Sequence, residues 1–118
     1  MKEYPIKKAL FAKCEAFVSE KIDSLERGLE SHQKALASET KSSAGDKHET
    51  GRAMLQLEME KSGRQLQEVL QLKVLLEKIS LQQQSEVIRL GSLVTTNRGI
   101  YFLAISMGKI AHRQTIYF

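Results

Sequence analysis

The sequence has few of the residues that usually build a many-sided core or a cross-linked scaffold. Its 118 residues include no Trp, 6% aromatic residues, one proline and one cysteine. A single thiol, Cys14, cannot form an internal disulfide, and we expect it to be a small buried side chain in a reducing compartment. No apolar run approaches the roughly 20 residues that span a bilayer. The N-terminal residues also lack the apolar segment of a signal peptide. We therefore expect a soluble, cytoplasmic protein.

The charge balance allows several classes of partner and requires none of them. The chain carries 18 basic and 14 acidic residues, a formal net charge of +4. This excess permits contact with nucleic acid or with an acidic protein surface, but a solvated helical surface explains it equally well. Only 42% of the residues are hydrophobic. Together with the shortage of aromatics, this favours an elongated shape with a narrow apolar seam.

Two apolar stripes with helical spacing occupy most of the chain. Pro5 suits the first turn of a helix, and nothing stops that helix before about Ala37. The first stripe repeats every three or four residues: Phe11, Cys14, Val18, Ile22, Leu25, Leu29, His32 and Leu36. The second has the same spacing: Leu55, Met59, Ser62, Leu66, Val69, Leu72, Leu76 and Ile79. We expect His32 to be a partly buried seam residue, and Leu70 and Leu75 to widen the second apolar face.

The two stripes predict an antiparallel helical hairpin, a coiled coil, over residues 1–85. The polar segment 38–52 separates them and forms the predicted tip. Each arm has about 30 residues, which at about 1.5 Å per residue gives a rod of about 45 Å. A hairpin of this kind is expected to be monomeric with its tip exposed.

Residues 86–118 have a different pattern, with β-branched and aromatic runs divided by turn residues. Gly91, Asn97-Arg98-Gly99 and Gly108 mark the divisions, and Asn97-Arg98-Gly99 predicts a hairpin turn. We expect two or three strands, which need a covering layer to be stable. The last residues form a strand-like run, so we expect an incomplete domain. The fold class is therefore predicted to be α+β.

The predicted tip carries two carboxylates three residues apart, Asp46 and Glu49. In a helical turn this spacing puts both on one side. One interpretation, which the spacing alone favours, is a capping box that starts the second helix. The other is a pair of oxygen ligands for Mg²⁺, completed by ligands from a target. His48 lies between them, but without a second His or a Cys nearby it does not predict a closed metal site. No nucleophile–base arrangement or phosphate-binding glycine loop is present.

These features together resemble the bacterial Gre-type transcript-cleavage factors. Gly45-Asp46-x-x-Glu49 is similar to their acidic hairpin tip, and the segment 90–95, Leu-Gly-Ser-Leu-Val-Thr, is similar to the entry of their FKBP-like C-terminal domain. Pro5-Ile6 is similar to the proline before their first helix. The resemblance covers the whole layout of the chain through about a dozen specific residues.

The resemblance implies a fold, a partner and a role for the tip. It implies a helical hairpin followed by an FKBP-like β-rich domain, and RNA polymerase as the partner. The hairpin would enter the polymerase's secondary channel, where Asp46 and Glu49 would help hold a shared Mg²⁺ so that backtracked RNA is cleaved. The protein would then be an accessory factor and not an enzyme. Lys41, Lys47 and Arg52 would contact nascent RNA or polymerase, with DNA as a further candidate.

Two other functions remain open at this point. After Glu49 the chain reads Thr50-Gly51-Arg52, where the family has a stretch containing Asn, Ala and Tyr. A regulator that occupies the polymerase channel without stimulating cleavage, or that inhibits it, would fit this altered tip. A structural coiled-coil module would fit the apolar seam and the capping interpretation.

Overall fold

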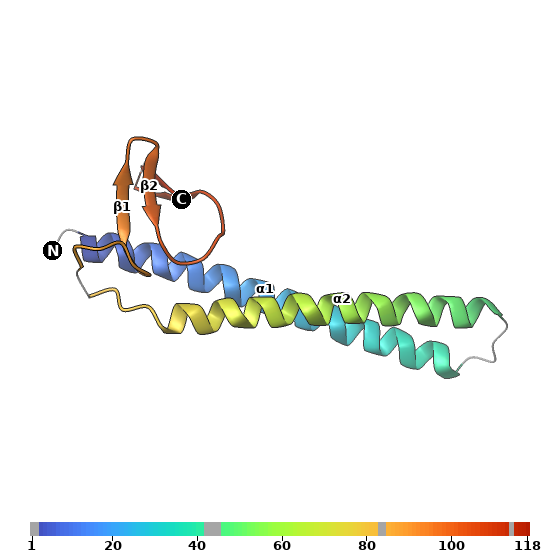
Figure 1. The fold of residues 1–118 in the computed structure, drawn as a ribbon. Helices are drawn as coiled ribbons and strands as arrows, with labels where there is room; N and C mark the ends of the chain where they lie inside the picture. Colours follow the sequence, from blue (N-terminus) through green and yellow to red (C-terminus); the bar gives the residue numbers. More distant parts are fainter. Residues whose placement is uncertain (1–2, 42–45, 83–84, 114) are drawn as a thin grey trace. The chain divides into compact units, whose positions relative to one another are not determined.

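The protein is described here by a computed structural model that covers residues 3–41, 46–82, 85–113 and 115–118, and the side chains of these residues outside 39–50. The described residues form two helices and a sheet of four strands (Figure 1). The elements are α1 (Glu3–Lys41), α2 (Asp46–Glu77), β1 (Leu93–Thr96), β2 (Gly99–Phe102), β3 (Ile110–His112) and β4 (Thr115–Tyr117). The α+β class is therefore confirmed. The chain divides into two compact units, Glu20–Leu70 and Met1–Ser19 with Gln71–Phe118.

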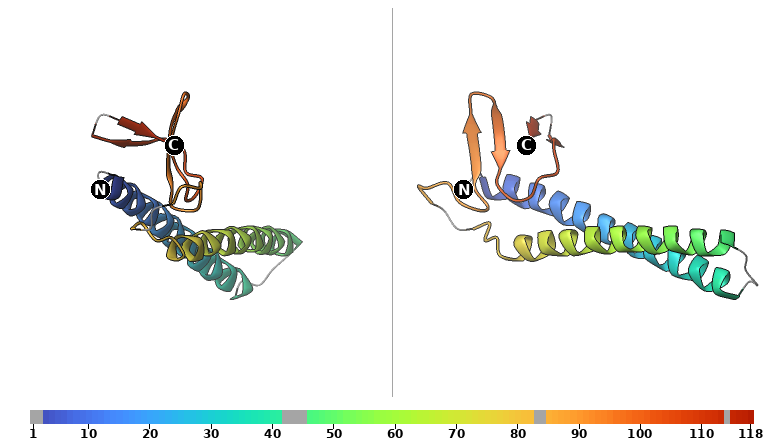
Figure 2. Two further views of the ribbon diagram at one scale, coloured as in Figure 1. Left: turned by 60° about the vertical axis from the view of Figure 1, so that its left-hand side comes forward. Right: turned by 45° about the vertical axis from the view of Figure 1, so that its right-hand side comes forward.

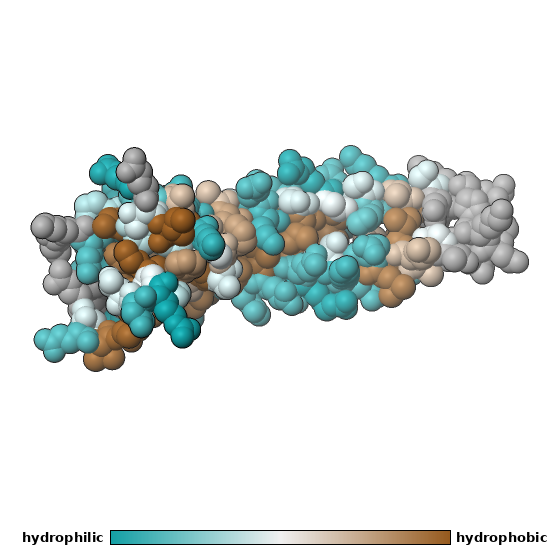
Figure 3. Space-filling model, turned by 90° about the horizontal axis from the view of Figure 1, so that it is seen from above, coloured by the Kyte–Doolittle hydropathy of each residue, from teal (hydrophilic) through white to brown (hydrophobic). Residues whose placement is uncertain are grey.

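The unit Glu20–Leu70 is a pair of antiparallel helices. Its parts of α1 and α2 run past each other at an angle in both views of Figure 2. Lys21 and Leu25, near the middle of α1, border the same small cavity as Gln65 and Val69 in the second half of α2. The predicted stripe residues in this unit are half-buried or buried, as expected: Ile22, Leu25, Leu29, His32, Leu36, Leu55, Met59, Ser62, Leu66 and Val69. Apolar side chains accordingly gather between polar outer rows along the helices (Figure 3).

α1 extends further into the predicted polar segment than its composition indicated, whereas α2 starts where the capping interpretation placed it. We expected α1 to end near Ala37, but it continues to Lys41, and α2 begins at Asp46. Polar residues such as Glu, Lys and Arg have good helix propensity, so a break in the apolar stripe does not require a break in the helix. The prediction that Leu70 widens the apolar face was wrong, since Leu70 is 42% exposed. Leu75 is half-buried.

The sheet has the strand order β1-β2-β4-β3. β1 and β2 form the predicted antiparallel hairpin, with Thr96 paired to Gly99 around Asn97-Arg98. The Thr96 hydroxyl stabilises this turn, because it accepts the Arg98 N–H and donates to the Gly99 carbonyl. β4 pairs in parallel with β2 and antiparallel with β3. The sheet therefore has four strands where we expected two or three.

One face of the sheet forms its buried side. The register places Phe102, Ile110 and Tyr117 on the same face, and all three are buried. Ile116, which points to the opposite face, is exposed. The helical parts of this unit contribute their own buried residues: Leu10, Cys14, Val18 and Leu76. This unit therefore has buried apolar residues both on its helical parts and on one face of the sheet.

A glycine bulge sets the register at the start of β1. The Ser92 N–H donates to the Arg89 carbonyl across a tight turn in which Gly91 has φ of 93°. This matches a type II turn, which requires a positive φ at its third residue. The Gly91 N–H donates to the Leu103 carbonyl at 2.7 Å, and the Leu103 N–H donates to the Ser92 carbonyl at 2.9 Å. Gly91 and Ser92 on one strand thus oppose Leu103 on the other, as in a β-bulge with glycine at its first position.

Candidate functional site

The predicted tip residues lie where the two helices end and begin. Asp46 is the first residue of α2, so Asp46, Lys47 and Glu49 all belong to its first turn. Lys41 is the last residue of α1. The side chains of residues 39–50 lie outside the described ones, so the contacts predicted for these four residues are not part of the structure. Arg52, one turn further along α2, is exposed.

The backbone position of the two carboxylates suits either interpretation of the tip. Helix N-termini carry partial positive charge and favour nearby carboxylates, which is the basis of the capping interpretation. Two carboxylates spaced i, i+3 also lie on one side of the helix. They supply the hard oxygen ligands that Mg²⁺ prefers, and Mg²⁺ commonly takes only one or two from a protein. Two carboxylates are therefore donors of the kind that Mg²⁺ takes, but they do not complete its coordination.

Outside the tip, the described side chains include no group of three His, Cys, Asp or Glu residues that could hold a metal ion. No described helix is long and apolar enough to cross a membrane.

Two chemically distinctive side chains occupy apolar surroundings. Cys14 is buried, as predicted, and burial raises the pKa of its thiol, with a smaller contribution in the same direction from the charge of Glu15. Both effects keep the thiol protonated and weakly nucleophilic. His32 is half-buried on the seam, also as predicted. Its Nδ1 atom is buried and has no hydrogen-bond partner among the described residues.

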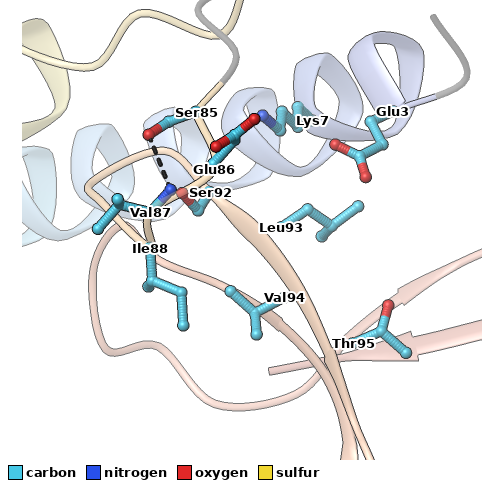
Figure 4. A pocket seen from close by; sticks show the side chains of 10 residues that line it. All are labelled: Glu3, Lys7, Ser85, Glu86, Val87, Ile88, Ser92, Leu93, Val94 and Thr95. Atoms are coloured by element: carbon cyan, nitrogen blue, oxygen red, sulfur yellow. Dashed lines mark hydrogen bonds between the residues drawn. The ribbon is translucent and has the colours of Figure 1, made fainter.

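A second site lies between the start of α1 and the start of the sheet, within one compact unit. It is a groove of about 710 Å³ (Figure 4), which we name the β1 groove. Its walls are Glu3 and Lys7 of α1, residues 85–88, and residues 92–95, which include most of β1. No motif in the sequence indicated this site.

Lys7 is the unusual member of the β1 groove. It is only 6% exposed, and among the described residues no ion pair or hydrogen bond engages its ammonium group. Lysines are rarely buried to this extent unless they are paired. The sequence did contain a signal, because Lys7 stands four residues before Phe11 and seven before Cys14. Extending the first stripe back by one turn would have placed this lysine on the apolar face of α1.

The edge of β1 contributes unpaired backbone groups to the same groove. β1 is a terminal strand of the sheet, with β2 on one side. Ser92 and Leu103 are hydrogen-bonded across the hairpin, and bonded pairs alternate with unbonded pairs in an antiparallel ladder. In the observed register, Leu93 and Thr95 therefore occupy unbonded positions. Their N–H and C=O groups point away from β2, and both residues line the groove.

The chain was compared with protein-family models, curated proteins and solved structures, and none of the three comparisons found a match.

Proposed function

We propose that this protein is a transcription elongation factor that binds RNA polymerase through its helical hairpin. The observation that carries the proposal is the position of Asp46 and Glu49 in the first turn of α2, directly after the connection from α1. On this proposal the helix pair is a coiled coil that enters the secondary channel, and the sheet belongs to an FKBP-like domain. The factor acts as a cytoplasmic monomer and has no catalytic centre of its own.

The tip carboxylates act by adding negative charge to the polymerase's active site. Asp46 and Glu49 are three residues apart in the first turn of α2, a spacing that puts two carboxylates on one side of a helix, so one element would present both to the same point. A Mg²⁺ ion retained there would supply Lewis-acid chemistry for RNA hydrolysis. Lys41, Lys47 and Arg52 flank this position along the chain and attract RNA phosphates. Backtracked RNA is thereby cleaved by the polymerase, and elongation resumes.

A channel regulator that binds without stimulating cleavage is the second candidate. It is favoured by Thr50-Gly51-Arg52, which differs from the segment that follows the acidic pair in the family. A self-associating coiled-coil module is favoured by two exposed apolar side chains on α2, Met54 and Leu57, at 63% and 64% exposure. The three functions differ in whether polymerase is bound, whether RNA is cleaved and whether the protein self-associates.

The proposal is tested with a stalled, backtracked bacterial RNA polymerase complex containing end-labelled RNA and Mg²⁺. The test variant is Asp46→Asn with Glu49→Gln. Asn is as good an N-cap as Asp, and Gln can replace Glu in a capping box, so this variant removes charge and keeps the cap. The unsubstituted protein is expected to accelerate RNA cleavage at least tenfold. The variant is expected to lose this effect and still bind the polymerase.

A second acidic pair provides a matched control. Asp23 and Glu26 have the same spacing, are exposed and lie on α1 in the helix-pair unit. Asp23→Asn with Glu26→Gln removes the same amount of charge from α1 instead of the tip. This variant should stimulate RNA cleavage as well as the unsubstituted protein does. Binding without faster cleavage by the unsubstituted protein would instead support the channel regulator. Absence of binding, with association in sedimentation, would support the coiled-coil module.

A further inference from the structure

We propose that the β1 groove binds an extended peptide segment that carries a carboxylate, by adding it as a fifth strand beside β1. The site does not depend on the proposed role of the hairpin tip, and the groove and the tip are in different units of the chain. Three observations support it: a strand edge and a buried lysine that have no partner among the described residues, and an exposed apolar wall.

The strand edge supplies the backbone pairing. The outward N–H and C=O groups of Leu93 and Thr95 are spaced as in one side of an antiparallel or parallel ladder. No hydrogen bond from the described residues reaches them. An exposed strand edge with unpaired groups is a template for an incoming strand. β1 here has neither a proline nor a charged residue to block such pairing.

Lys7 supplies the chemical preference of the site. Lys7 lines the groove and is only 6% exposed. A charge pair 4 Å apart near a protein surface is about four times stronger than the same pair in bulk water. Glu3 and Glu86 also line the groove, but both are exposed, so solvent and salt screen their charges. The buried cation therefore dominates, and the favoured ligand has a carboxylate at this point.

The third wall favours apolar side chains on the incoming strand. Val87 and Ile88 line the groove and are 73% and 64% exposed. The Ser85 hydroxyl accepts the Val87 N–H at 3.1 Å, which holds this short segment in place (Figure 4). A strand presents alternate side chains to opposite faces, so an acidic residue flanked by apolar ones matches Lys7 and this wall together.

The test uses the full chain and three nine-residue peptides with acetylated and amidated ends. Each peptide alternates Val and Thr, and its central residue is Asp, Asn or Lys. Affinities are measured by fluorescence anisotropy, and amide signals by NMR. The Asp peptide is expected to bind at least tenfold more tightly than the Asn peptide, and the Lys peptide more weakly still. The amides of Leu93 and Thr95 should shift and exchange more slowly on binding.

Three substitutions separate the contribution of the Lys7 charge from that of the β1 edge. Lys7→Met keeps the unbranched stem but removes the charge, and should abolish the difference between the Asp and Asn peptides. Thr95→Pro removes an N–H that points away from β2, so it should leave the hairpin intact and abolish peptide binding. Thr95→Val keeps that N–H and should bind normally. Circular dichroism confirms that each variant is folded.

Several results would overturn the proposal. It fails if no peptide binds, if Asp and Asn peptides bind equally, or if folded Thr95→Pro still binds the Asp peptide. It also fails if sedimentation shows a dimer that Thr95→Pro dissociates, because a second copy of the chain would then occupy the edge. Failure of the unsubstituted protein to accelerate RNA cleavage would leave the peptide-binding result unchanged, so the two proposals fail separately.

Discussion

Replacing Leu10 by Ala should reveal how much the buried face of α1 contributes to stability. Leu10 is fully buried at 0% exposure. Removing its three outer carbons forfeits about 2.4 kcal/mol of transfer free energy, at about 0.8 kcal/mol per buried carbon group. A remaining cavity of about 50 Å³ adds roughly 1 kcal/mol. We therefore expect a loss of about 3.5 kcal/mol in the free energy of unfolding.

The assay is urea unfolding followed by circular dichroism at 222 nm. With an m-value of about 1.5 kcal/mol/M, the midpoint should fall by roughly 2 M. Leu57→Ala is the matched control, because it is the same change in a helix at a side chain 64% exposed. Its effect should stay within about 0.5 kcal/mol. Equal shifts for the two variants, with unchanged m-values, would refute the assignment of Leu10 to the core.

The remaining predictions concern four other residues. His32→Leu should raise the free energy of unfolding by about 1 kcal/mol in thermal melts, since it removes the buried Nδ1, which has no hydrogen-bond partner among the described residues. A lower melting temperature would contradict this. Because burial raises the pKa of Cys14, its contribution to stability should be complete below about pH 8.5 and decline as the pH rises further. The decline is measured by comparing the urea midpoints of the unsubstituted protein and of Cys14→Ala as the pH is raised above about 8.5. A constant difference between the two midpoints at every pH would contradict the prediction. Gly91→Ala should destabilise by more than 1 kcal/mol, since φ is 93° and the added carbon would meet Ile79 at 3.0 Å. Gly28→Ala, in open space within α1, should stabilise the protein by about 0.5–1 kcal/mol. The two glycine predictions are contradicted if calorimetry shows that both substitutions stabilise the protein or that both destabilise it.

The periodic features of the fold could be predicted from sequence because they are local. The stripes that include Leu25 and Leu66 follow the helical repeat, and both residues are half-buried. The Asn97-Arg98-Gly99 turn also depends on neighbouring residues alone. The parallel pairing of Ile100 with Tyr117 could not be predicted from the sequence, because the tertiary fold sets the contact between these two strands. β3 is only three residues long and gives too short a pattern to recognise.

The two candidate sites also differ in how far the sequence alone could predict them. Asp46 and Glu49 were visible in the sequence as an acidic pair with helical spacing, and their location in α2 agrees with the expected start of the second helix. The burial of Lys7 was not predicted, because the predicted apolar stripe begins at Phe11, one helical turn after it. The unpaired edge of β1 could not be anticipated, since it depends on which strands become terminal in the sheet. Burial of a charge and exposure of an edge are properties of the folded chain.

The most direct test of the proposed function is a cross-link from the tip to RNA. A benzophenone amino acid is introduced in place of Lys47, or in place of Lys34 as a control on the exposed surface of α1. Each derivative is irradiated in a backtracked polymerase complex with labelled RNA. The account predicts that the RNA 3′ segment cross-links to the derivative at position 47 and not to the one at position 34. Equal cross-linking at both positions, or none at position 47 in a complex that binds the protein, would contradict it.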